Sequence, residues 1–157
     1  MTQIDFDEIE IRELPYEHAD STMLHSAQRA EISAAYGNED SDPSEPTTSE
    51  NVSAFVVAYT DGMPAGCGGL RAVADDEFEV KRMYVTPAHR GTGVSTAVLA
   101  ALEGIARDRG VRRLVLETGD RLPAAIRFYE REGYSRIENF GPYAGVETSV
   151  CYAKQLS

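Results

Sequence analysis

The sequence is poor in positive charge. Its 15 Lys and Arg residues stand against 26 Asp and Glu residues, which gives a formal net charge of −11 at pH 7. A protein that binds nucleic acid neutralises phosphates with clustered Lys and Arg, so this composition argues against a nucleic-acid partner. An acidic field attracts cationic small molecules such as amines, although it also serves simply to keep a protein in solution.

Cysteine and histidine are also scarce. Cys67 and Cys151 lie far apart, each inside an apolar run, and form no CxxC pair. We therefore expect two reduced, buried thiols. The three histidines, His18, His25 and His89, lack the spacing of metal ligands, so we expect surface positions for them and no metal cofactor.

Long hydrophobic runs are absent as well. No apolar stretch is long enough to span a bilayer, and the acidic segment 1–8 lacks the apolar core of a signal peptide. These absences predict a cytoplasmic protein without a membrane partner. The length of 157 residues suits one domain over 1–157, and the 42% hydrophobic and 26% charged fractions are typical of a globular chain.

Hydrophobic periodicity and turn residues predict a strand, a helix, three strands, a helix, a strand, a helix and a last strand. The expected strands cover 6–14, 52–59, 64–73, 77–85, 111–118 and 146–154. The expected helices cover 16–36, 94–109 and a short stretch from 123 that ends at Gly133. A meander with flanking helices, followed by a strand–helix–strand crossover, predicts an α/β fold of the α+β type, with a mixed, mostly antiparallel sheet.

The most informative segment joins the strand ending at Val85 to the helix that starts at Val94. Gly91 and Gly93 let the backbone turn tightly and approach a ligand, and the helix presents free N–H groups there. A pyrophosphate is the natural ligand for such a site. A P-loop lysine is missing, and Thr96 stands where a dinucleotide-binding motif would have its third glycine. A plain structural turn is the alternative.

Residues 85–94 resemble the acetyl-CoA signature of the GNAT superfamily, V-x-P-x-x-R-G-x-G-I/V followed by a small residue. Matching segments at 79–85, 116–119 and 125–134 extend the resemblance over about 78–134. It implies a sheet splayed between its two central strands and an N-acetyltransferase that uses acetyl-CoA as donor. It further implies a donor site of two parts. Pantetheine would contact Met83 and Val85, and the phosphates would contact Arg90, Gly91, Thr92, Gly93, Val94 and Ser95.

The same resemblance points to Tyr129 as the general acid, because it occupies the tyrosine of the A-I-x-x-Y helix motif; the alternative is an aromatic packed on the sheet. Glu79 and Glu117, on neighbouring strands, are the candidate bases, although a strand carboxylate often faces solvent. Glu31 is a weaker third candidate. Leu122 replaces an asparagine that is common in the family, which leaves that cofactor contact unexplained.

Two segments carry open interpretations. The stretch 37–50 contains five carboxylates and no basic residue, and we expect a mobile acidic loop there. It would act either as a lid that draws in a cationic acceptor or as a solvated surface excursion. The aromatic stretch 140–143 would line the acceptor pocket or form a rigid turn.

The function that this resemblance implies is acetyl transfer to the primary amine of a small molecule by direct attack. A protein N-terminal or lysine acetyltransferase is the nearest rival, and a non-catalytic acyl-CoA sensor of the same fold is the second. The expected partners are an amine acceptor and, as one option, a second copy of the chain in a homodimer.

Overall fold

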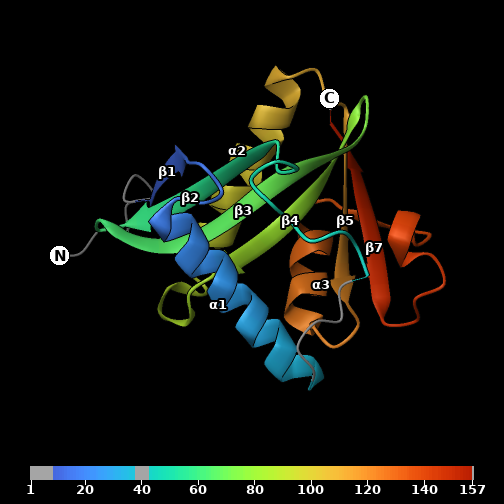
Figure 1. Cartoon of the computed structure of the whole chain (residues 1–157), viewed down its shortest axis with the longest axis horizontal. Helices are drawn as coiled ribbons and strands as arrows, with labels where there is room; N and C mark the ends of the chain where they lie inside the picture. The colour runs from blue at the N-terminus through green and yellow to red at the C-terminus, as the bar shows by residue number, and fades with distance from the viewer. Residues whose placement is uncertain (1–8, 38–42, 157) are drawn as a thin grey trace.

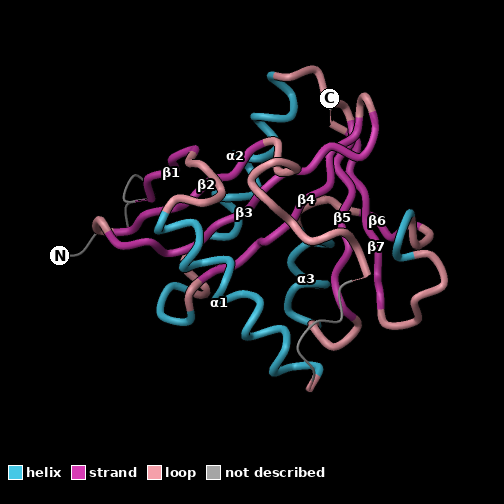
Figure 2. The backbone as a smooth tube through the Cα atoms, in the orientation of Figure 1, coloured by secondary structure: helices cyan, strands magenta, loops and turns pink. Residues whose placement is uncertain are grey.

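The computed structural model describes residues 9–37 and 43–156, whose centre is a seven-stranded sheet in the order β1-β2-β3-β4-β5-β7-β6 (Figure 1, Figure 2). The strands are β1 (Ile9–Glu13), β2 (Ala54–Thr60), β3 (Met63–Ala74), β4 (Glu77–Val85), β5 (Arg113–Gly119), β6 (Ser135–Ile137) and β7 (Ser149–Gln155). Neighbouring strands are antiparallel except β4 and β5, which run parallel. The predicted α/β fold with a mixed, mostly antiparallel sheet is confirmed.

Within the described residues, three α-helices and two short 3₁₀ segments accompany the sheet. They are α1 (Ala19–Tyr36), η2 (Pro87–His89), α2 (Val94–Asp108), α3 (Pro123–Arg131) and η3 (Gly141–Tyr143). Helix α1 covers one face of the sheet, where Leu24 packs against Phe55 and Cys67. Helices α2 and α3 bury their apolar sides on the opposite face. Figure 1 shows α1 in front of the sheet and α2 behind it.

The boundaries differ from the sequence prediction where local chemistry intervenes. Helix α1 starts at Ala19 rather than at residue 16, because the ring Nδ1 of His18 accepts a hydrogen bond from the backbone N–H of Asp20 at 3.1 Å and caps it. Strand β5 starts at Arg113, because Val111 still donates its N–H to Ala106 at the end of α2. Strand β6 was not predicted, since three residues carry no periodicity.

Glycines on β3 allow α2 to lie close to the sheet. A Cβ atom at Gly66 would lie 2.7 Å from Cγ1 of Val94, and one at Gly68 would lie 2.9 Å from Cγ1 of Val98. Either distance is too short for real packing, so larger residues here would push α2 away. The glycines thereby fix the position of the N-terminus of α2 above the end of β4.

The two central strands separate. Strands β4 and β5 pair only through Glu77–Glu79 and Arg113–Val115, although β4 continues to Val85 and β5 to Gly119. Strand β5 instead pairs with β7 along its whole length. The predicted splay is therefore present, and it leaves one edge of β4 beyond Glu79 without a neighbouring strand among the described residues.

Candidate functional site

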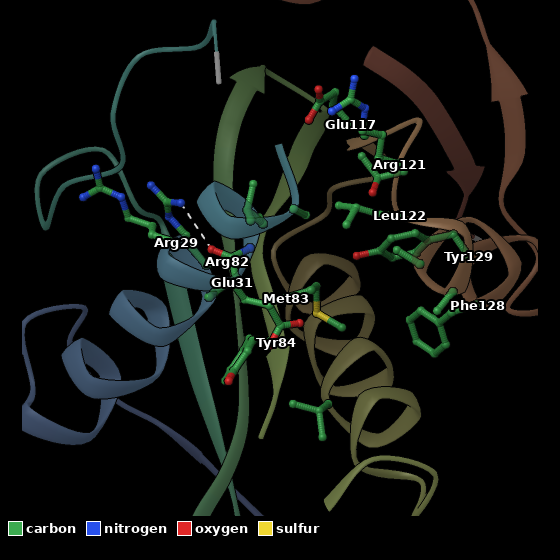
Figure 3. Close-up of a pocket in the computed structure, with 18 of the residues that line it drawn as sticks. Arg29, Glu31, Arg82, Met83, Tyr84, Glu117, Arg121, Leu122, Phe128 and Tyr129 are labelled. Atoms are coloured by element: carbon green, nitrogen blue, oxygen red, sulfur yellow. Dashed lines mark hydrogen bonds between the residues drawn. The ribbon is translucent and has the colours of Figure 1, made fainter. Parts of the chain in front are cut away.

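A cavity of about 540 Å³ lies where β4 and β5 diverge. Its walls come from the second half of α1, the end of β4, the end of β5 and helix α3. Figure 3 shows Arg29 and Arg82 on the α1 side, Phe128 and Tyr129 on the opposite side, and Glu117 and Arg121 at one end. Cavities of this volume commonly hold small ligands and cofactors.

A bulge in β4 shapes the wall of this cavity. Lys81 pairs with Gly69 and Tyr84 pairs with Cys67, so two residues of β4 face one residue of β3. Arg82 takes the extra position with a φ of 61°, in the left-handed region. This conformation costs a non-glycine residue roughly 1–2 kcal/mol, and such bulges commonly re-aim side chains near active sites.

The open edge of β4 is suited to a ligand that contains amides. Met83 and Val85 line the cavity, and their side chains pack on the side of the sheet that carries α2. A strand edge without a partner presents N–H and C=O groups that an extended chain with amide bonds can pair with. The predicted pantetheine contacts at these two residues therefore have a suitable backbone beside them.

The glycine-rich loop lies at the end of this edge. Gly91 and Gly93 have φ angles of 76° and 91°, and Gly93 is the N-cap of α2. Gly93 has no side chain with which to cap the helix, so the first N–H groups of α2 can bind an anion. Ser95 lines the cavity from the first turn of α2. The segment thus has the geometry of a phosphate site.

Arg90 connects this loop to α1. Its Nη2 atom lies 2.6 Å from Oε2 of Glu31, and its Nε atom donates to the carbonyl oxygen of Val85 at 3.1 Å. Both side chains of the ion pair are about half exposed, so the pair contributes little to stability. Arg90 can therefore exchange Glu31 for a stronger anion at small cost.

Tyr129 is buried, with 7% of its surface exposed, and it lines the cavity. Its ring contacts Phe128 and Tyr134 at centroid distances of 5.1 and 5.9 Å. Burial raises the pKa of the Tyr129 hydroxyl above its ordinary value of 10. The hydroxyl therefore carries its proton at neutral pH and could donate it to a leaving group.

The two candidate bases lie in different surroundings. Glu117 lines the cavity, and its Oε2 atom accepts a hydrogen bond from Oγ of Ser149 at 2.7 Å. Glu79 does not line the cavity. It is 2% exposed, pairs with Arg71 at 3.0 Å, and accepts a hydrogen bond from the Tyr143 hydroxyl at 2.5 Å.

The prediction of Glu79 as a candidate base is therefore corrected, because its side chain does not line the cavity. The register of β3 and β4 places Arg71 directly opposite Glu79, and the buried carboxylate is neutralised across the strands. Glu31, the third candidate, lies at the cavity and is engaged with Arg90. Glu117 is the carboxylate that the geometry favours.

The structure also decides between the two readings of the aromatic stretch 140–143. Tyr143 is fully buried in η3, and its ring contacts Phe140 at 5.2 Å. Its hydroxyl lies 3.1 Å from Nζ of Lys81, in the same cluster as Glu79. The stretch forms a rigid turn with packed aromatics, away from the cavity lining.

The described part of the acidic segment is held against the sheet. Arg71 donates to the carbonyl oxygen of Glu45 at 2.7 Å, and Arg82 donates to Oγ1 of Thr47 at 2.8 Å. The hydroxyls of Thr47 and Tyr16 lie 2.7 Å apart. Residues 43–50 are thus an exposed loop that is bonded to neighbouring elements through Glu45 and Thr47, whereas Glu39, Asp40 and Asp42 lie outside the described residues.

Several cavity residues were not singled out in the sequence. They are Arg29, Tyr36, Arg82 and Arg121. Tyr36 lies over Gly119, where an added Cβ would come within 2.6 Å of the ring carbon Cζ, and its hydroxyl accepts the backbone N–H of Arg121 at 3.2 Å. The end of α1 therefore closes over the end of β5, a contact between segments far apart in the sequence.

Within residues 9–37 and 43–156, no group of His, Cys, Asp and Glu side chains could hold a metal ion. Cys67 and Cys151 are both free and buried, as expected from their apolar surroundings. Among the helices described, none combines the length and the apolar character needed to cross a membrane.

Comparison with known proteins gives a consistent set of similarities. Residues 11–134 match the sequence profile of the Acetyltransferase (GNAT) family. The chain is 35% identical to the IAA acetyltransferase of Azospirillum brasilense over 65% of its own length and 67% of that protein. It spans 46–62% of the length of five further curated relatives that it matches. A structure described as an acyl-CoA N-acyltransferase from Klebsiella pneumoniae superposes with a TM-score of 0.80 at 31% identity, covering 95% of this chain and 98% of that one. PaiA N-acetyltransferase from Thermoplasma acidophilum, in complex with coenzyme A, has a TM-score of 0.69 at 19% identity and covers 94% and 98%.

Proposed function

Because the chain belongs to the acetyltransferase (GNAT) family and is thereby an N-acyltransferase, we propose that it transfers an acetyl group from acetyl-CoA to a primary amine of a small molecule. The observation that carries this proposal is the splay of β4 and β5. It opens a cavity with an unpaired strand edge, a glycine-rich helix N-terminus and the buried Tyr129 around it.

The residues present suit the donor. The backbone of β4 near Met83 and Val85 would hold the pantetheine amides, and the segment 90–95 would hold the phosphates through N–H groups and the Arg90 side chain. The structure of PaiA, which shares the fold, is in complex with coenzyme A and supports coenzyme A as the carrier of the acetyl group. Acetyl-CoA supplies a thioester whose carbonyl carbon accepts the amine and whose sulfur leaves as a thiolate.

The chain's own groups would perform the proton transfers. Alkyl amines have pKa values near 10.4 and are mostly charged at neutral pH, so the acceptor must lose a proton before it attacks. Glu117, directly or through water, would take that proton. A backbone N–H on the open edge of β4 would stabilise the oxyanion as the C–N bond forms. Tyr129 would donate its proton to the sulfur as the C–S bond breaks.

The contact of Tyr36 with Gly119 and Arg121 favours a small molecule over a protein. Tyr36 packs over Gly119 and bonds to the backbone of Arg121, which narrows the route by which a polypeptide would reach the cavity. A protein N-terminus or lysine would require an open groove there. The absence of nucleic-acid and membrane partners, the cytoplasmic location and a homodimer remain predictions from the sequence.

The test is to incubate the purified protein with acetyl-CoA and a panel of amines and peptides while free thiol is followed. We expect amine-dependent thiol release with small amines and much less with peptides. Turnover of peptides alone would assign the protein acetyltransferase alternative. Tight binding of acetyl-CoA without thiol release for any acceptor would assign the non-catalytic sensor and contradict the proposal.

A further inference from the structure

Among the described residues, the lining of the cavity is richer in cations than the sequence as a whole. The lining includes five cationic side chains and two carboxylates, whereas the whole sequence has 15 Lys and Arg against 26 Asp and Glu. The cations are Arg29, Lys81, Arg82, Arg90 and Arg121, and the carboxylates are Glu31 and Glu117. Arg90 belongs to the predicted phosphate loop, so the donor accounts for part of this charge. Arg82, on the α1 side, is the cation that the donor does not explain.

Arg82 is distinguished by its partners. Its Nε atom donates to Oγ1 of Thr47 at 2.8 Å, and its Nη1 atom donates to Oε1 of Gln28 at 3.2 Å. Both partners are neutral, and no carboxylate pairs with Arg82 in the part of the chain that the structure describes. The side chain is partly buried, which makes an uncompensated charge costly.

The other cations that are not exposed make the contrast clear. Arg71, Arg113 and Lys154 each form an ion pair with a glutamate at 3.1 Å or less, and Lys81 has a carboxylate oxygen at 3.9 Å. Among these described cations, Arg82 is the one whose guanidinium lies at a cavity wall and bonds only to neutral groups. A guanidinium has five N–H donors, so three of them stay available to a ligand.

The backbone explains why this side chain faces the α1 side. The bulge places Arg82 in the left-handed region at 61°, and its hydrogen bonds reach Gln28 on α1 and Thr47. Met83 and Val85 pack on the opposite side with α2. Figure 3 shows Arg29 beside Arg82 on this wall, across the cavity from Tyr129. The bulge thus turns the Arg82 side chain away from the wall of the cavity that would hold the donor.

We propose that the acceptor carries a carboxylate as well as its amine, as an amino acid does, and that Arg82 binds this carboxylate. The inference rests on the proposed function and names the substrate class of the same site. A planar guanidinium matches a carboxylate in geometry and balances its single charge, whereas a phosphate monoester carries more than one. The acceptor's amine would then lie toward Glu117.

The experiment measures thiol release with the standard L-amino acids, each beside its α-amide, its decarboxylated amine and its aminophosphonate analogue. We expect kcat/KM for the acid to exceed that for the amide by about tenfold or more, the usual scale of a charged hydrogen bond at about 1.5–3 kcal/mol. In Arg82→Gln this ratio should fall close to one, and Arg82→Lys should retain part of it. A purely structural role of Arg82 would leave the ratio unchanged.

Arg112→Gln is the matched control, because Arg112 is exposed and lies outside the cavity lining. Its ratio should equal that of the wild type. Amides or decarboxylated amines that react as well as the acids would overturn the inference while the proposed function stands, and so would an unchanged ratio in Arg82→Gln. A preference for phosphonates over carboxylates would also overturn it. If no amine at all is acetylated, the proposed function itself fails.

Discussion

The two walls of the cavity are built in different ways. The wall assigned to the donor is one contiguous stretch, in which backbone groups of β4, the loop at Gly91 and Gly93, and the start of α2 follow one another. The wall assigned to the acceptor consists of side chains from α1, the β4 bulge at Arg82 and the end of β5, and Thr47 supports Arg82 from behind. Backbone recognition tolerates side-chain changes, so the donor site is expected to be robust and the acceptor site to determine specificity.

The largest expected effect is on kcat, because the reaction takes place between the two walls. Tyr129→Phe should leave acetyl-CoA affinity unchanged and lower kcat by roughly 10²–10⁴, the range for loss of a general acid. Burial raises the pKa of Tyr129, so the wild-type enzyme should keep this acid protonated beyond pH 10. Steady-state kinetics together with calorimetry measure both quantities. Turnover within a few-fold of wild type would mean that Tyr129 is structural and that water protonates the thiolate.

The next effect concerns the donor wall alone. Gly93 has a φ of 91°, which a β-branched residue resists, and a side chain there would obstruct the approach of the pyrophosphate. Gly93→Val should weaken acetyl-CoA binding by about 100-fold, equivalent to about 2.8 kcal/mol. Gly104→Ala is the control, because a Cβ there meets no atom within 4 Å. Unchanged affinity in a folded Gly93→Val variant would remove the phosphate assignment.

A smaller effect is expected where α1 closes over β5. Gly119→Ala would place a Cβ against the ring of Tyr36 and displace it, which removes its hydrogen bond to the backbone of Arg121. We expect KM for the acceptor to rise by about two- to tenfold, the value of one hydrogen bond, while acetyl-CoA affinity stays near the wild-type value. A loss confined to donor affinity would show that the walls are assigned in reverse.

The smallest effect concerns the acidic segment. A variant in which amides replace all five carboxylates of this segment should have nearly the wild-type KM for an amino acid; the five are Glu39, Asp40, Asp42, Glu45 and Glu50. The reason is that the Arg82 side chain, rather than the electric field of the segment, binds such an acceptor. For a purely cationic amine the replacement should raise KM at low salt only, since salt screens exposed charges. A rise for both acceptors at low ionic strength would favour the lid interpretation.

The donor wall was the part of the site best predicted from the sequence, because the glycines, the start of the helix and the family motif all lie in one continuous stretch. Sequence reasoning failed for Glu79, because a regular hairpin centred on Asp75 and Asp76 would place Ala72 opposite Glu79, whereas the irregularity between Ala72 and Ala74 shifts Arg71 into that position. The sequence did not identify Arg82 as a site residue. Its position depends on a β-bulge with positive φ, and no residue type in the sequence indicates such a bulge. Sequence reasoning also missed the contact of Tyr36 with Gly119, since packing between distant segments leaves no local pattern.

The proposed function requires that the protein transfer an acetyl group to an amine in this cavity. The most direct measurement uses acetyl-CoA labelled in the acetyl group, with mass spectrometry of the products beside quantification of free thiol. We expect an N-acetylated amino acid that carries the label in an amount equal to the thiol released. Thiol release that is independent of the amine, or a label that remains entirely on coenzyme A, would contradict it.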